Sequence, residues 1–227
     1  MGLAHSPKIV TDGLVFCVDA ADKKSYSGSG TTWTDRGGNG NNGTLTNGPT
    51  FDSANGGSIV FAGDDEYIAT NNILELGSSN FSINIIFKST GTSWQYFTSN
   101  KANFNGPFCR TGMELTSGKL RFYLEEDNQS NLVVLSQNAY NDGNWYEVVF
   151  VRTGSTGYIY VNGQLENSGT TKSGNVGDST SNWAIGGGPG DSSGNLIGSI
   201  STVKIYNKAL TADEVLQNYN ATKSRFS

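Results

Sequence analysis

The sequence is poor in the residues that most hydrolases use for acid–base chemistry. Its 227 residues include one histidine, His5, and two cysteines, and charged residues make up only 15% of the chain. A Ser-His-Asp triad, a Cys-His pair and a histidine-based zinc site all need histidine beside their other members. A single histidine near the N-terminus therefore argues against these three classes of site.

Basic clusters and long apolar runs are also missing. Lys and Arg number 15 against 20 Asp and Glu, which gives a net charge of −5. No cluster of cations can neutralise several phosphates, so we expect no nucleic-acid partner. Residues 1–8 lack the pattern of a secretory signal, and no segment approaches the ~20 apolar residues of a membrane span. The sequence predicts a soluble chain without membrane insertion.

The two cysteines, Cys17 and Cys109, allow one disulfide. Cys17 lies inside the apolar run at residues 14–18, where a buried thiol behaves as a small hydrophobic side chain. We expect free thiols, with the single disulfide as the alternative.

Small polar residues dominate what is present. Gly, Ser, Thr and Asn together make up close to half of the chain, and these residues favour turns, caps and exposed strand faces over helix interiors. A mostly helical fold is therefore excluded. Aromatic residues, at 11%, and repeated β-branched runs supply enough apolar area for a folded core.

Alternation of apolar and polar residues predicts half-buried strands. In residues 81–88 the odd positions are apolar, and the other face carries Ser82, Asn84 and Lys88. In residues 120–125 the even positions are apolar. A period of two places such residues on opposite strand faces, so we expect one buried and one wet face in each strand.

Other runs are apolar on both faces. Residues 14–18, 132–135 and 145–151 show this pattern, which is typical of central strands covered on each side. Two packed sheets would provide that cover. Asn162-Gly163 separates two further runs and predicts a type I′ hairpin turn, because Asn and Gly adopt positive φ angles readily.

The end of the chain predicts one short helix. Thr211 and Glu214 have the spacing of a capping box, and we expect the helix to run through about Asn218. Val215, Leu216 and Tyr219 fall on one face. Docking of this face on the sandwich is the expected role, with partner binding as the alternative.

Nothing in the sequence marks a second domain. Gly/Ser/Asn stretches such as 27–30, 37–43 and 186–195 have the length of loops, and no repeat of fixed period emerges. We predict an N-terminal arm at residues 1–12 and a single domain at residues 13–227.

Paired carboxylates are the remaining route to catalysis. A glycosidase needs two acids facing the scissile bond, and the best candidates are Glu125, Glu126 and Asp127. Neighbouring residues of a strand point to opposite faces, so this run does not aim two carboxylates into one cleft. We interpret it as a solvated hairpin end and expect no enzymatic activity.

Two clusters are candidates for binding. Asp64 and Asp65 follow the strand-like run 59–61 and offer hard oxygens of the kind that Ca²⁺ prefers, although two carboxylates are far fewer than its ~6–8 ligands. A solvated acidic turn is the alternative.

The second candidate is a polar-aromatic surface. It comprises Trp94, Tyr96, Asn103, Arg121 and Tyr123. Aromatic rings cover the apolar C–H face of a pyranose, while Asn and Arg hydrogen-bond its hydroxyls, so we predict carbohydrate binding here. Core packing is the alternative for Trp94 and Tyr96. It is the expected role of Trp145 and Trp183.

Several segments carry a family resemblance. Residues 13–20, 32–45 and 57–61, followed by Asp142-Gly143-Asn144-Trp145-Tyr146 and residues 205–215, resemble the concanavalin A-like, laminin-G-like jelly-roll domains in order and spacing. The resemblance implies an all-β jelly-roll sandwich of two curved antiparallel sheets with a short C-terminal helix. It brings no catalytic residues, since the Glu-x-Asp-x-x-Glu strand of laminarinase-type glucanases is absent.

The resemblance also has implications for calcium binding and for the biological setting of the domain. Many laminin-G-like domains place an Asp where this chain has Ser201, which weakens the case for their calcium site. Residues 33–35, 47–51 and 218–222 look most like domains encoded by tailed bacteriophages of aquatic bacteria. This likeness implies a non-enzymatic domain on the virion surface that binds host cell-surface polysaccharide. The alternative is a virion structural or decoration protein that binds capsid or tail proteins or forms a homo-oligomer.

Overall fold

The computed structural model describes residues 7–100, 111–125, 131–170, 176, 182–188 and 194–226. These residues form two antiparallel sheets and one C-terminal α-helix, which confirms the predicted all-β sandwich. The helices are α1 (Ala212–Thr222) and the 3₁₀ turns η1 (Ala54–Gly56) and η2 (Lys223–Arg225).

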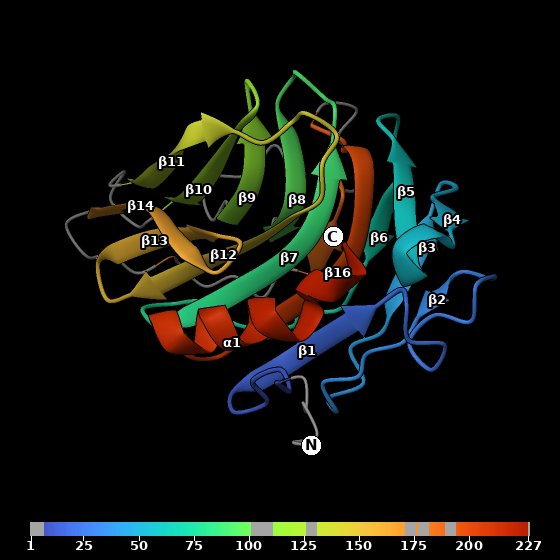
Figure 1. The fold of residues 1–227 in the computed structure, drawn as a ribbon, viewed down its shortest axis with the longest axis horizontal. Helices are drawn as coiled ribbons and strands as arrows, with labels where there is room; N and C mark the ends of the chain where they lie inside the picture. The colour runs from blue at the N-terminus through green and yellow to red at the C-terminus, as the bar shows by residue number, and fades with distance from the viewer. Residues whose placement is uncertain are drawn as a thin grey trace, which may run out of the picture.

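Sheet I, as we name it, contains β1 (Leu14–Asp19), β4 (Thr50–Asp52), β5 (Ser58–Ala62), β7 (Phe81–Ser89), β12 (Tyr146–Thr153), β13 (Thr156–Val161), β14 (Gln164–Thr170) and β16 (Ile197–Tyr206). Its order is β14-β13-β12-β7-β16-β5-β4, and β1 pairs with β16. The helix α1 lies across the outer face of this sheet (Figure 1).

Sheet II contains β2 (Thr32–Trp33), β3 (Gly43–Thr46), β6 (Tyr67–Ala69), β8 (Gln95–Asn100), β9 (Thr111–Thr116), β10 (Lys119–Glu125), β11 (Asn131–Ala139) and β15 (Trp183–Ile185). Its order is β11-β10-β9-β8-β15-β6-β3-β2. Strands β8 to β11 lie behind sheet I in Figure 1.

The main core fills the space between the two sheets. The odd positions of β7, from Phe81 to Phe87, and the even positions of β10, from Leu120 to Leu124, are fully buried there, as the alternation predicts. Trp183 is also buried, whereas Trp145 is only partly buried, so the core prediction holds for Trp183 and is wrong for Trp145.

The other face of β7 is buried at two of its three predicted polar positions, and only Lys88 is partly exposed as predicted. Ser82 and Asn84 are fully buried, because α1 and the segment before it cover this face. Asn84 Nδ2 donates to Glu147 Oε1 at 3.1 Å, and Lys204 Nζ donates to Asn84 Oδ1 at 2.9 Å. Thr222 Oγ1 donates to Glu147 Oε2 at 2.6 Å. Buried polar groups are tolerated when they are hydrogen-bonded in this way.

The helix is longer than predicted and docks on the sandwich through Val215, as predicted, but also through residues that the prediction missed. The capping box of Thr211 and Glu214 is present, but α1 continues to Thr222. Its buried residues are Val215, Asn218 and Thr222, while Leu216 remains 37% exposed. Asn218 accepts a hydrogen bond from the Val10 amide at 2.8 Å and donates to the Tyr206 hydroxyl at 3.1 Å. These tertiary contacts offset the low helix propensity of Asn.

The N-terminal segment lies against the same helix. Gln217 Nε2 donates to the Lys8 carbonyl at 2.7 Å, and the Tyr206 hydroxyl donates to the Val10 carbonyl at 3.1 Å. The division into an arm at 1–12 and a domain at 13–227 stays a prediction. Within the described ranges, no helix is long and apolar enough to cross a membrane.

The three runs predicted as central strands differ in their surroundings. The run at 145–151 becomes β12, which is buried between β7 and β13 as predicted. Strand β1 is largely buried but pairs with β16 alone. The run at 132–135 becomes β11, at the end of sheet II, where Val133 and Leu135 are 45% and 42% exposed. The prediction is wrong for β11, because Val133 and Leu135 lie beside Tyr123 and Arg121 on the outer face of sheet II, which is partly open to solvent there.

The β13–β14 hairpin of sheet I contacts β11, the edge strand of sheet II. Asn162 and Gly163 both have positive φ, 50° and 81°, and join β13 to β14 as predicted. Glu166 then accepts hydrogen bonds from two backbone amides of β11 at 3.0 Å, and Asn167 donates to a β11 carbonyl at 2.8 Å. Side chains thus satisfy backbone groups that an edge strand would otherwise leave unpaired.

Cys17 is a free, buried thiol. Burial raises the pKa of this thiol from 9.0 to about 11, with nearby Lys204 acting in the opposite direction. Cys109 lies outside the described residues.

We expect Cys17 to resist alkylation in the folded protein, because the thiolate is the reactive species and is scarce at pH 8. Iodoacetamide should modify it only after unfolding in guanidinium, as measured by peptide mass spectrometry that separates Cys17 from Cys109. The folded pKa lies above the unfolded one, so the protonated thiol stabilises the fold below about pH 9, and this contribution is lost as the pH rises through about 11. Rapid modification of Cys17 under native conditions at pH 8 would contradict this prediction.

Candidate functional site

The outer face of sheet II brings four of the predicted surface residues together around a buried carboxylate. In the strand register Tyr96 and Arg121 both pair with Glu114, so these three residues form one row across β8, β9 and β10. Trp94 immediately precedes β8, and Tyr123 lies two residues beyond Arg121 on the same face of β10.

Glu114 holds two of these side chains in place. Trp94 Nε1 donates to Glu114 Oε2 at 2.8 Å, and Arg121 Nη1 donates to the same oxygen at 2.7 Å. The side chain of Glu114 is 1% exposed and that of Arg121 is 26% exposed. A buried carboxylate is costly unless it is paired and hydrogen-bonded, and charge-assisted bonds are the stronger kind. The indole and the guanidinium are therefore fixed from below while part of each reaches the surface.

The aromatic rings differ in exposure. The Trp94 and Tyr96 rings meet edge to face with centroids 4.5 Å apart, and the Arg121 guanidinium lies 4.2 Å from the Tyr123 ring centroid. Tyr96 is only 2% exposed, and its amide donates to the Gly194 carbonyl at 2.8 Å. The geometry places Tyr96 as a support for Trp94, whereas Trp94, Arg121 and Tyr123 are partly exposed.

The sequence prediction missed Glu114. Its position among Gly112, Met113 and Leu115 shows that it lies on the non-core face of a strand, but only the pairing register places it opposite Arg121. Asn103, the fifth predicted surface residue, lies outside the described residues. Glu125 ends β10 and is partly exposed, and Glu126 and Asp127 lie outside the described residues.

The acidic loop after β5 makes its own internal contacts. Asp64 and Asp65 are exposed, and Asn47 Nδ2 donates to both the carboxylate and the carbonyl of Asp65 at 3.0 Å. Glu66 accepts from the Ala62 amide. In the part of the chain that the structure describes, no group of three or more His, Cys, Asp and Glu residues could hold a metal ion. Calcium binding by Asp64 and Asp65 stays a prediction, and these carboxylates alone fall short of its ligand number.

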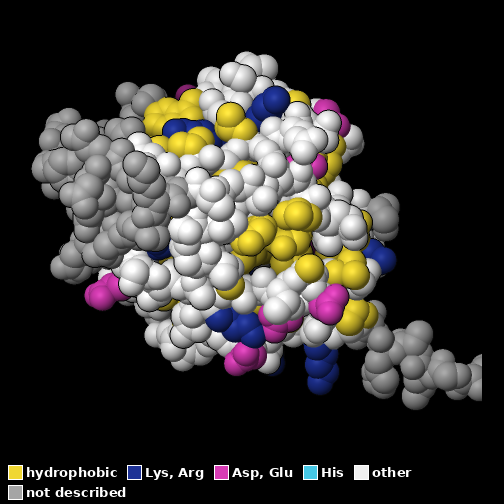
Figure 2. Space-filling view, turned by 90° about the vertical axis from the view of Figure 1, so that its left-hand side faces the viewer, with side chains coloured by type: hydrophobic (Ala, Val, Ile, Leu, Met, Phe, Trp, Pro, Cys, Tyr) yellow, Lys and Arg dark blue, Asp and Glu magenta, His cyan; other side chains and the backbone are white. Residues whose placement is uncertain are grey.

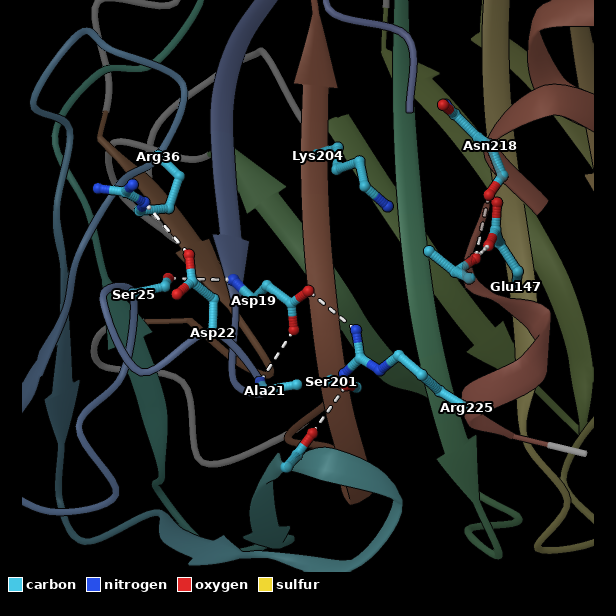
Figure 3. Close-up of polar contacts among 12 residues, drawn as sticks. Asp19, Ala21, Asp22, Ser25, Arg36, Glu147, Ser201, Lys204, Asn218 and Arg225 are labelled. Carbon is cyan, nitrogen blue, oxygen red and sulfur yellow. Dashed lines mark hydrogen bonds and ion pairs between the residues drawn. The ribbon is translucent and has the colours of Figure 1, made fainter. Parts of the chain in front are cut away.

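Ser201 has a structural role away from that loop. It is fully buried, and its hydroxyl donates to the Gly57 carbonyl at 2.8 Å. Arg225 reaches across to donate to Ser201 Oγ and to Asp19 Oδ2, each at 2.8 Å (Figure 3). Gly57 precedes β5 and Asp64 follows it. Ser201 therefore contacts the far end of β5 from the acidic loop.

Replacing Glu114 by Gln should lower the free energy of unfolding by about 1–3 kcal/mol, because a neutral amide cannot balance Arg121 and brings an N–H group toward the Trp94 donor. Urea denaturation of both proteins measures the change. The control is Glu75→Gln, an exposed glutamate, for which we expect a change within about 0.5 kcal/mol. Equal stabilities of the two variants would contradict the supporting role of Glu114.

Calcium should have a small effect on stability. A ligand at 100 times its Kd adds about 2.7 kcal/mol to the folded state, which corresponds to a rise of roughly 5–10 °C in Tm for a chain of this size. We expect a smaller rise between chelator and millimolar calcium, one that Asp64→Asn with Asp65→Asn abolishes. A Tm that calcium leaves unchanged would contradict calcium binding at this loop.

Comparison with known protein families and solved structures identifies proteins with a similar fold. Residues 61–216 match the family model described as the concanavalin A-like lectin/glucanases superfamily. A search of curated proteins by sequence found no match. The structure resembles the binding domain of Paraclostridial Mosquitocidal Protein 1, with 16% identity, a TM-score of 0.75 and coverage of 93% of this chain and 52% of that one.

Two further solved structures are similar. The botulinum neurotoxin serotype D binding domain shares 13% identity, with a TM-score of 0.69 and coverage of 92% of this chain and 52% of that one. Domain 4 of AbnA, an extracellular arabinanase from Geobacillus stearothermophilus, shares 18% identity, with a TM-score of 0.68 and coverage of 91% and 98%. The chain spans about half the length of the two toxin domains. By its family match and its fold, it belongs to the concanavalin A-like lectin and glucanase superfamily.

Proposed function

We propose that this chain is a non-enzymatic carbohydrate-binding domain that contacts its ligand through Trp94, Arg121 and Tyr123. The observation that carries the proposal is the buried Glu114, which fixes the indole and the guanidinium from below. Rings held in this way can cover the C–H face of a sugar, and the remaining N–H groups of Arg121 can donate to hydroxyls. Fixing the side chains before binding lowers the entropy cost of association.

The same geometry argues for binding over hydrolysis. Within the described residues, Glu114 is the carboxylate that belongs to this row in the strand register, and its Oε2 already accepts from Trp94 and Arg121. A glycosidase would need two carboxyl groups able to approach the glycosidic bond. The similar structures also support a binding role. Two of them are described as binding domains, and the arabinanase domain was solved in complex with arabinotriose.

The virion setting rests on the sequence resemblance to domains of tailed bacteriophages. In this setting the domain stands on the virion surface, other virion proteins are its neighbours, and host cell-surface polysaccharide is its ligand. The similar botulinum neurotoxin serotype D domain, solved with N-acetylneuraminic acid, supports a cell-surface glycan as the ligand class.

A second candidate function is a virion structural or decoration protein. The observation in its favour is a set of exposed apolar side chains on both sheets. Val133 and Leu135 of β11 pair with Tyr123 and Arg121 and so lie on the outer face of sheet II, whereas Leu165 of β14 (56% exposed) pairs with Tyr160 of sheet I, and Leu216 lies on α1. Figure 2, which views the molecule from the left-hand side of Figure 1, shows hydrophobic side chains gathered in the middle of that side. Exposed apolar patches mark protein interfaces, so in this function a capsid or tail protein, or a second copy of the chain, would be the partner.

Trp94→Ala and Tyr123→Ala separate the two functions. We expect each to weaken binding of the best-bound oligosaccharide from a glycan array by about 1–3 kcal/mol, by analogy with aromatic stacking on planar ligands, as measured by calorimetric titration. The Tm of Tyr123→Ala should change little, because this ring is not in the core. Trp94→Ala also removes one of the two donors to the buried Glu114 and should cost about 1 kcal/mol of stability, which is less than the loss of a core ring. Leu165→Ser is the control and should leave glycan binding unchanged.

The opposite pattern would favour the structural function. Truncating a core ring costs about 3–5 kcal/mol of stability. A large loss of Tm in both aromatic variants, or loss of glycan binding in Leu165→Ser, would contradict the carbohydrate surface.

A further inference from the structure

A pocket opens on the outer face of sheet I, on the opposite side of the sandwich from Trp94 and Arg121. Its volume is about 370 Å³, at the lower end of the ~300–1,000 Å³ of small-molecule sites. Ile86 of β7 and Glu147 of β12 line it from the sheet, and Tyr219 and Lys223 line it from α1 and η2. It lies where α1 ends and its cover of the sheet becomes incomplete.

Aromatic rings form much of the pocket wall. Trp145, which the sequence predicts to be a core residue, lines the pocket together with Phe226, and their ring centroids lie 4.9 Å apart at an interplanar angle of 44°. Tyr219 adds a third ring. Partly exposed aromatic rings in a hollow offer apolar faces that a ring-shaped ligand can cover.

Two lysines beside these rings lack an acidic partner. Lys88 Nζ lies 5.1 Å from the Trp145 ring centroid, and Lys223 Nζ lies 5.6 Å from that of Tyr219. Among the described residues neither lysine forms an ion pair. This is notable in a chain whose net charge is −5, and it gives the pocket an attraction for anions.

The other charged groups nearby are already engaged. Glu147 is 5% exposed, and its two oxygens accept from Asn84 and Thr222; Figure 3 shows it beside α1. Arg225 donates to Asp19 and Ser201, and its guanidinium lies 5.0 Å from the Phe226 ring centroid. Arg225 therefore adds positive charge beside the pocket, but Lys88 and Lys223 are the two cations there that lack an anionic partner among the described residues.

We propose that this pocket is a second binding site, which takes one acidic sugar residue of the uronate class. The C–H face of the pyranose lies against Trp145 and Phe226, and its carboxylate is directed toward Lys88 and Lys223. A neutral sugar would leave both ammonium groups without an anionic partner, and a small inorganic anion would leave the rings uncovered. The site is independent of the surface at Trp94, Arg121 and Tyr123.

The test is an NMR titration of the full chain with D-glucuronate, with D-glucose and sodium acetate at matched ionic strength as comparison ligands. D-glucuronate should cause saturable shifts of the Trp145 indole N–H, with a Kd at least tenfold lower than that of D-glucose. Acetate should leave this signal unchanged. Because charge contributes, added salt should weaken the binding of D-glucuronate.

Lys88→Gln and Lys223→Gln should each weaken D-glucuronate binding about three- to tenfold. Lys23→Gln removes the same charge at an exposed position in the loop after β1 and is the matched control, which should bind like the parent. Lys223 also caps the C-terminus of α1, where a cation is stabilised by the helix dipole. The Lys88 variant tests the pocket without that effect.

Three results would overturn the proposal: equal affinity for D-glucose and D-glucuronate, unchanged affinity in both lysine variants, or shifts confined to Trp94, Arg121 and Tyr123. The last result would assign D-glucuronate to the surface on sheet II. Conversely, loss of glycan binding in Trp94→Ala with intact shifts at Trp145 would leave the pocket assignment standing, so the two proposals fail separately.

Discussion

Both sheets of the sandwich have an outer face, and the described chain has one α-helix with which to cover them. That helix lies on sheet I (Figure 1). Its buried residues Val215, Asn218 and Thr222 close over a sheet face that carries Asn84 and Lys204, so polar groups become fully buried there and must bond to one another. None of the described helices covers the outer face of sheet II, and Arg121 and Tyr123 stay partly exposed. The placement of α1 thus limits the outer face of sheet I to a pocket at the end of the helix, whereas sheet II offers an open polar-aromatic surface.

Each sheet contains a buried glutamate whose carboxylate accepts hydrogen bonds, and the two glutamates have different roles. Glu147 accepts from Asn84 of β7 and from Thr222 of α1, so its carboxylate ties the helix to sheet I. Glu114 accepts from Trp94 and Arg121, which both reach the surface. In each case the desolvation cost of the carboxylate is offset by charge-assisted hydrogen bonds. The first arrangement stabilises the fold, and the second fixes side chains that are able to contact a ligand.

The sequence predicts local features well where one or two residues determine them. Positive φ at Asn162 and Gly163 follows from their conformational freedom, and the capping box of Thr211 follows from its spacing to Glu214. The alternation in β7 likewise identifies the core face.

The sequence alone does not show which element packs over a given sheet face or which strands pair with each other. The burial of Asn84 depends on α1, which is more than a hundred residues away in the chain. The exposure of Val133 depends on its place beside Tyr123 on the outer face of sheet II, which is partly open to solvent there. Trp94, Arg121 and Tyr123 are predictable as a polar-aromatic cluster, whereas Glu114 joins them only through the pairing of β8, β9 and β10.

Hydroxyl-radical footprinting with and without a bound oligosaccharide, read by mass spectrometry, tests the carbohydrate surface on sheet II most directly. It reports on side-chain exposure in the unmodified protein, so folding defects of variants do not enter. Carbohydrate binding there predicts that Trp94 and Tyr123 lose reactivity when the sugar is bound, while Leu165 and Leu216 keep theirs. Unchanged reactivity of Trp94 and Tyr123, with protection confined to Leu165 and Leu216, would contradict it.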